Sequence, residues 1–238
     1  MDYSFHIYNK LATDGVTMST DKLLLEHFQR KNSKMTGAGT RSSQNCADFD
    51  GLDLLSAPSD GLQKINLSKL SLNKQEKTMT SPPPVVVCVG SDLAIGDSLG
   101  PITGSLIKYK TQGVHCFLYG TLAAPVTAKE IKYMRSFLKK THPDSQILAI
   151  DAAVGEKGDI GVIKITDSPL FPGAGANKQL GSIGDISILG IVAEKSAGNY
   201  GILNSTRLNL VYTMAEIISE AVAAILWERS CNSLLKNA

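Results

Sequence analysis

The sequence predicts an α/β fold in which a central, mostly parallel sheet is covered by helices on both faces, giving three layers. Two observations support this. Strand-like runs alternate with helical patterns, and each run is almost continuously apolar, as expected of strands buried on both faces. The expected strands cover 85–89, 114–119, 146–150, 160–165 and 185–192. The expected helices cover 98–109, a segment that begins near Thr127, and a long terminal stretch from about Ser205 to Leu226 or beyond.

Each expected element has a local cause. The first strand is a β-branched run, Val85–Val89, which stops at Gly90. Thr127 and Glu130 have the spacing of a capping box, which predicts the start of a helix, and that helix should end before Pro143. The terminal helix is indicated by apolar residues at helical spacing, namely Leu208, Val211, Ala215, Ile218, Val222 and Ile225.

Residues 1–82 are expected to form an extension outside the domain, which would cover 83–238. A short amphipathic helix is predicted at about 19–30, because Ser19 offers a cap and apolar residues follow on one side. The stretch 31–81 is rich in Ser, Asn, Gly, Lys and Gln and has no sustained period, which is typical of a disordered linker.

Composition narrows the functional classes. The chain has 238 residues, is 43% hydrophobic and 19% charged, and carries a net charge of +2. This near-neutral balance gives no electrostatic reason to expect nucleic acid or a membrane surface as a partner. The four cysteines lack the spacing of a metal site or a disulfide framework, and Cys88 is expected to be a small core residue. Without a signal-peptide pattern or a continuous apolar run of about 18 residues, a cytoplasmic protein is expected.

Two aspartates occupy the positions where an open α/β sheet places its chemistry. Asp97 lies in the turn after the first expected strand, and Asp151 directly follows the third. The carboxyl ends of parallel strands line a common crevice. Two carboxyl groups brought together there do not both ionise easily, so one holds a proton while the other acts as a base. Such a pair suits peptide or ester hydrolysis. The simpler alternatives are that Asp97 caps a helix and that Asp151 forms a turn.

Other candidates lie nearby in the sequence. Asp92 could line the rim of the crevice, or serve only its turn. Gly173, Gly175 and Lys178 resemble a phosphate cradle, but the full Gly-x4-Gly-Lys-Ser/Thr pattern is absent. Their backbone amides could instead form an oxyanion hole or hold an extended substrate. A simple glycine-rich turn is an equally good interpretation.

Four blocks carry a family resemblance: GSDLAIGDSLGP, AIDAAVG, PGAGANK and NSTRLNLVYTMAEII. In this order, over 83–226, they resemble sporulation proteins of the YyaC type and, more distantly, the germination protease of spore-forming bacteria. The resemblance implies that Asp97 and Asp151 are the functional acids. The architecture is also similar to that of hydrogenase maturation endopeptidases, which bind nickel through an acid directly after the turn aspartate. This chain has Ser98 there, so no metal and no other cofactor is expected.

The combined expectation is a peptidase that acts on a protein or peptide substrate through paired aspartates and without a metal. The alternative is a non-enzymatic interaction protein of sporulation or development that retains the fold. Hydrolysis of esters or amides linked to nucleic acid is a third reading, which the near-neutral charge disfavours. The sequence is also compatible with assembly into a homo-oligomer.

Overall fold

The computed structural model describes residues 1–36, 83–173, 181–195, 203 and 206–236. Within these residues, six strands form one sheet in the order β1-β5-β6-β4-β2-β3. Their bounds are β1 Asp2–His6, β2 Val85–Cys88, β3 Leu118–Tyr119, β4 Ile147–Gly155, β5 Val162–Thr166 and β6 Ile186–Glu194. Strands β3, β2, β4 and β6 run parallel; at one edge, β5 pairs antiparallel with β6 and β1 pairs antiparallel with β5.

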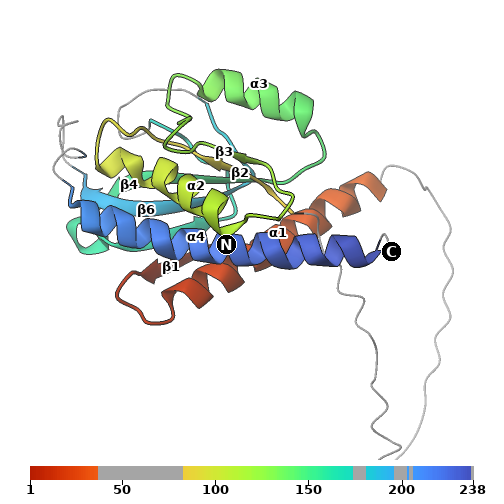
Figure 1. The fold of residues 1–238 in the computed structure, drawn as a ribbon, viewed down its shortest axis with the longest axis horizontal. Coiled ribbons are helices and arrows are strands. Elements are labelled where there is room, and N and C mark those ends of the chain that lie inside the picture. The colour runs from red at the N-terminus through yellow and green to blue at the C-terminus, as the bar shows by residue number, and fades with distance from the viewer. Residues whose placement is uncertain (37–82, 174–180, 196–202, 204–205, 237–238) are drawn as a thin grey trace, which may run out of the picture.

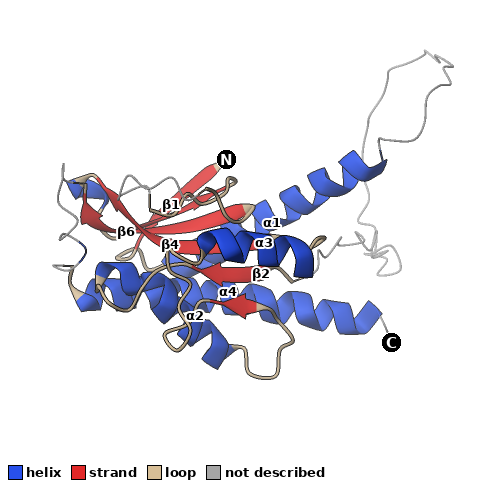
Figure 2. Cartoon of the chain, turned by 90° about the horizontal axis from the view of Figure 1, so that it is seen from above, coloured by secondary structure: helices blue, strands red, loops and turns tan. Residues whose placement is uncertain are grey.

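Helices cover both faces of this sheet, which confirms the three-layer α/β/α prediction. Their bounds are α1 Ala12–Thr36, α2 Leu99–Lys110, α3 Ile131–Thr141 and α4 Leu208–Lys236. The larger core joins α1, α2 and α4 to one face, and a smaller core joins α3 to the other (Figures 1 and 2). One half of the predicted capping box is present, since a carboxylate oxygen of Glu130 accepts a hydrogen bond from the Thr127 amide at 2.9 Å. The Glu130 amide instead donates to the backbone carbonyl of Thr127, and α3 begins only at Ile131.

The chain reverses its direction across the sheet between β2 and β4. From β2 it passes through α2 on one face to β3, and then returns through α3 on the other face to β4, on the far side of β2. In open α/β sheets, the crevice at the carboxyl ends of two strands that flank such a switch is the usual ligand site. The topology therefore indicates a candidate ligand site at the residues that follow β2 and at those of β4.

The strand β5 belongs to the antiparallel part of this mostly parallel sheet. It pairs antiparallel with β6, and β6 lies between it and β4. The connection from β4 to β5 covers only 156–161, including a short 3₁₀ turn at Lys157–Asp159. A parallel arrangement would need a crossover of about a dozen residues or more, so this short link forces the reversal.

The N-terminal segment corrects the expected domain boundary. β1 pairs with β5 from Asp2↔Thr166 to His6↔Val162, so residues 1–36 are part of the domain rather than an extension. The predicted helix at 19–30 lies inside the longer α1, which buries Val16, Leu23 and Leu24 in the main core. The sequence did not show this because the partners of the segment lie far along the chain. The predicted linker after residue 36 falls outside the described residues.

Replacing Leu23 with Ala tests whether this segment is integral to the domain. Leu23 is fully buried, and removing its side chain is expected to lower the free energy of unfolding by about 2–5 kcal/mol. The matched control is Leu11→Ala, at a leucine that is 65% exposed, which should change stability by less than about 0.5 kcal/mol. Urea unfolding followed by circular dichroism measures both. Equal effects of the two variants would show that α1 does not contribute to the core.

The helix α4 is long and apolar enough to cross a membrane, by length and composition, over Leu208–Cys231. This helix does not contain a continuous apolar run of the expected length, because Glu216 and Glu220 interrupt its apolar residues. In the domain, 56% of its most apolar window is buried, and its apolar residues belong to the main core. Burial of this kind is typical of a core helix, and a single such helix is weak evidence for a membrane span.

Candidate active site

Asp97 is held in a tight turn between β2 and α2. The Ser91 amide donates a hydrogen bond to the backbone carbonyl of Asp97 at 3.1 Å, which closes the turn. Gly90 makes this possible because its φ is +142° and a Cβ there would stand 2.1 Å from the same carbonyl oxygen. Asp97 lies in the 3₁₀ turn Gly96–Ser98, and Ser98 rather than Asp97 is the N-cap of α2. The alternative reading of Asp97 as a helix cap is therefore wrong.

Asp151 lies inside β4, whereas the sequence placed it just past a strand end. β4 continues to Gly155 because it pairs with β6 on one side, and Asp151 is opposite Leu189. On its other side, the pairing with β2 ends at Cys88↔Ile150, so Asp151 is the first residue beyond β2. Its side chain is 7% exposed, and Oδ1 accepts a hydrogen bond from the Ala152 amide at 2.8 Å. The turn-forming alternative is not observed.

The two carboxyl groups lie near the carboxyl end of β2, close enough for the charge of Asp97 to act on Asp151. Burial raises the pKa of Asp151 well above its usual range, and the nearby charge of Asp97 raises it further. The pKa of Asp97 is also raised by burial, although the Ser91 amide opposes this. Asp151 is the more deeply buried of the two groups, so desolvation disfavours its ionised form more strongly. Two carboxyl groups that influence each other in this way titrate as a pair.

Cys88 borders this pair but does not supply a nucleophile. It is fully buried in β2, which confirms its prediction as a small core residue. Burial raises the pKa of its thiol, and the charge of Asp151 raises it further. A thiol in this environment stays protonated and unreactive.

Glycines allow α2 to lie directly on the end of β2. A Cβ on Gly100 would stand 1.9 Å from the carbonyl oxygen of Val89, and one on Gly104 would stand 2.0 Å from that of Gly120. No larger residue fits at either position without moving the helix. Since Asp97 immediately precedes α2, this close contact fixes where its carboxyl group stands.

The other predicted site residues are not brought to the pair by any contact in the described part of the chain. Asp92 is exposed on the turn after β2. Gly173 has a φ of +75° and ends the described part of its loop, while Gly175 and Lys178 lie outside the described residues. Across the described ranges, no three His, Cys, Asp or Glu side chains are grouped so that they could hold a metal ion.

Two cavities were not predicted from the sequence. One, of about 640 Å³, lies along β3 and includes Val126, whose carbonyl accepts a hydrogen bond from the Gly90 amide at 3.0 Å. The other, of about 990 Å³, is lined by basic residues of α1 and α3. A sequence signal for the latter did exist: His27, Arg30, Lys31 and Lys34 recur at the spacing of one helix face.

The sequence matches a known family. The family described as "Protein of unknown function (DUF1256)" matches residues 61–221, and this chain belongs to it. Among its relatives is a protein of Bacillus subtilis (strain 168) described as "Uncharacterized protein YyaC", which is 39% identical over 152 residues, or 64% of this chain and 74% of that protein. The resemblance to YyaC-type proteins is thereby confirmed.

A solved structure of the NiFe hydrogenase maturation protease HycI from Thermococcus kodakarensis KOD1 is also similar. The similarity covers 63% of this chain and 97% of that chain, with a TM-score of 0.40 and 16% sequence identity. At this level, the likeness indicates nothing about activity.

Proposed function

We propose that the protein is a peptidase that hydrolyses peptide bonds with Asp97 and Asp151. The observation that carries the proposal is the proximity of the buried Asp151, whose pKa is raised, to the more exposed Asp97 at the switch point of the sheet. A carboxylic acid and a carboxylate in one crevice supply the two groups that acid–base hydrolysis requires.

In the proposed reaction, the carboxylate of Asp97 takes a proton from a water molecule as the water oxygen attacks the carbonyl carbon of the peptide. Asp151 donates its proton, and the leaving amine departs protonated as the C–N bond breaks. Transfer of a proton from Asp97 back to Asp151 restores the starting state. These steps need no metal ligand at position 98, where the chain has Ser98.

The cavity along β3 supports a peptide as the substrate. β3 is the edge strand of the sheet, and extended peptides commonly bind along such edges. The cavity is lined in part by apolar side chains, including Leu118, Tyr119 and Met134. The carbonyl of Val126, in the wall of the cavity, accepts a hydrogen bond from the Gly90 amide. The cavity therefore adjoins the turn that carries Asp97. An apolar substrate side chain in this cavity would place the neighbouring peptide bond near the pair.

The test compares the wild type with Asp97→Asn and Asp151→Asn. Each is incubated with a panel of unfolded small proteins and with a peptide of residues 37–82, and products are identified by mass spectrometry. Cleavage by the wild type is expected to fall about 10²–10⁴-fold in each variant. Asp144→Asn, at an exposed position before β4, should cleave like the wild type. Chelation with EDTA should leave the rate unchanged.

Equal cleavage by the wild type and both Asn variants would contradict the proposal. Absence of cleavage by the wild type across the whole panel would favour the alternative, an interaction protein of sporulation or development that retains the fold.

A further inference from the structure

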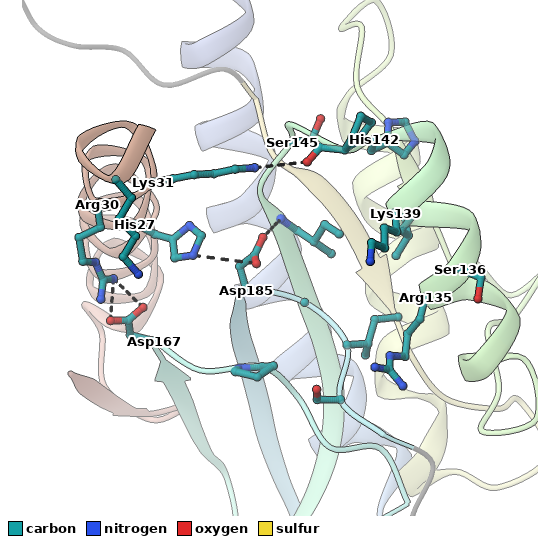
Figure 3. Close-up of a pocket in the computed structure, with 18 of the residues that line it drawn as sticks. His27, Arg30, Lys31, Arg135, Ser136, Lys139, His142, Ser145, Asp167 and Asp185 are labelled. Carbon is teal, nitrogen blue, oxygen red and sulfur yellow. Dashed lines mark hydrogen bonds and ion pairs between the residues drawn. The ribbon is translucent and has the colours of Figure 1, made fainter. Parts of the chain in front are cut away.

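The larger cavity lies at the opposite end of the sheet from the acid pair. It has a volume of about 990 Å³ and lies between α1 and α3 (Figure 3). Its lining includes Ile147, the first residue of β4, and Asp185, which directly precedes β6. Asp151 stands further along β4, about 13 Å from Ile147 at the usual rise of a strand. This cavity, here named the basic pocket, is separate from the candidate active site.

Positive charge dominates the basic pocket. Six cationic side chains come from two helices: Arg30, Lys31 and Lys34 from α1, and Lys132, Arg135 and Lys139 from α3. Two carboxylates, Asp167 and Asp185, share the lining with them. The excess of positive charge is local, because the net charge of the whole chain is only +2.

Both carboxylates already have partners. Asp167 accepts hydrogen bonds from Arg30 at 2.7 and 2.8 Å. Asp185 accepts a hydrogen bond from the Ile147 amide at 2.9 Å, and His27 Nε2 lies 3.9 Å from it. Within the described residues, four cationic side chains of the pocket then have no hydrogen-bond or ion-pair partner: Lys34, Lys132, Arg135 and Lys139.

Cationic side chains from both helices border the same cavity. Lys31 extends from α1 across the pocket and donates a hydrogen bond to the Pro143 carbonyl at 3.4 Å (Figure 3). From the other side, Nη1 of Arg135 lies 2.3 Å from the point where a Cβ on Gly181 would stand. The absence of a side chain at Gly181 thus leaves room for the guanidinium at the wall of the pocket. Cations gathered in one cavity repel each other unless an anion binds between them.

We propose that the basic pocket binds a small molecule that carries a diphosphate group. A diphosphate supplies several negative charges at a spacing that separate Lys and Arg side chains can share. The planar guanidinium of Arg135 matches phosphate oxygens in a two-pronged contact, and the lysines act as point charges. The volume suits a ligand of this size, since small-molecule sites measure about 300–1,000 Å³. Inorganic pyrophosphate and a nucleoside diphosphate share this chemistry.

Isothermal titration calorimetry of the full chain with inorganic pyrophosphate and with ADP, in about 0.15 M NaCl, tests the proposal. Arg135→Gln and Lys139→Gln are each expected to raise the Kd about tenfold or more, because each removes a charged donor. The control is Lys140→Gln, at the next residue of α3, which is exposed and does not line the pocket. Its Kd should stay within about twofold of the wild type. All these positions are exposed, so folding is not at risk.

Binding of both ligands with the expected loss in the pocket variants supports a shared diphosphate site. If ADP binds more tightly than pyrophosphate, the ligand is a diphosphate ester of an organic group rather than the inorganic ion. Absence of heat with both ligands would overturn the proposal, as would equal weakening by Lys140→Gln, which would indicate diffuse surface attraction. Preference for a hexaglutamate peptide over pyrophosphate would overturn the ligand class.

Discussion

Asp151→Asn is expected to raise the free energy of unfolding at neutral pH, although it removes a candidate catalytic group. Burial and the charge of Asp97 hold the pKa of Asp151 well above the value of about 3.9 in an unfolded chain. Between the unfolded and folded pKa values, the folded state retains a proton that the unfolded state has released. Stability therefore falls as pH rises through this window, by up to about 1.4 kcal/mol per pH unit. Asn carries no charge at any pH and avoids this loss.

Urea unfolding at a series of pH values from about 4 to 8 measures the effect. The difference in stability between Asp151→Asn and the wild type should be smallest at the acid end, where the unfolded wild-type chain has released the least of this proton. The free energy of unfolding of the variant should then rise relative to that of the wild type as pH increases. Asp144→Asn provides the control, since that position is exposed and should leave the pH dependence unchanged. Lower stability of Asp151→Asn at pH 7 would show that Asp151 is ionised and stabilised in the folded domain.

Gly100→Ala is expected to destabilise the domain by about 1–3 kcal/mol, although helices generally favour alanine over glycine. In an exposed helix, the same change would stabilise by roughly 1 kcal/mol. Here the new methyl group would stand 1.9 Å from the carbonyl oxygen of Val89, so α2 must move away from β2. The movement would also displace Asp97, and hydrolysis should fall together with stability.

Gly158→Ala is the matched control, because a Cβ there would meet no atom within 4 Å and the residue lies in a short 3₁₀ turn. It should change the free energy of unfolding by less than about 0.5 kcal/mol. Chemical denaturation of the two variants under the same conditions compares them directly. A stabilising effect of Gly100→Ala would mean that α2 is not held against β2 as described.

The part of the fold that was predicted correctly is the part governed by near neighbours. The strand at 85–89 and the helix that follows it appear within one or two residues of their expected bounds, whereas the helix expected near Thr127 begins at Ile131. The sequence analysis predicted no direction for β5, since that direction depends on β6 lying between β4 and β5. The segment 1–36 was misplaced for a similar reason, because β1 has no partner until β5 is in position.

For the candidate sites too, the features that depend on near neighbours were predicted and those that depend on distant segments were not. Asp97 and Asp151 were identifiable because strand ends in an α/β sheet are predictable positions for polar groups, and their family blocks supported the choice. Their roles as the catalytic pair remain a prediction. The basic pocket was missed because its cationic residues lie on two helices that are far apart in the sequence. The charged face of one helix does not predict a pocket, which forms only when α1 and α3 lie on either side of the same strand ends.

The class of fold, the main elements of the region after residue 83, and the two aspartates of the proposal could be predicted from the amino-acid sequence. They follow from periodicity, caps and glycine turns, which act over a few residues. The strand order, the burial that shifts the pKa of Asp151, and the contact of Arg30 with Asp167, two residues 137 positions apart, are visible only in the folded domain. Such features depend on which distant segments become neighbours, and local patterns do not carry that information.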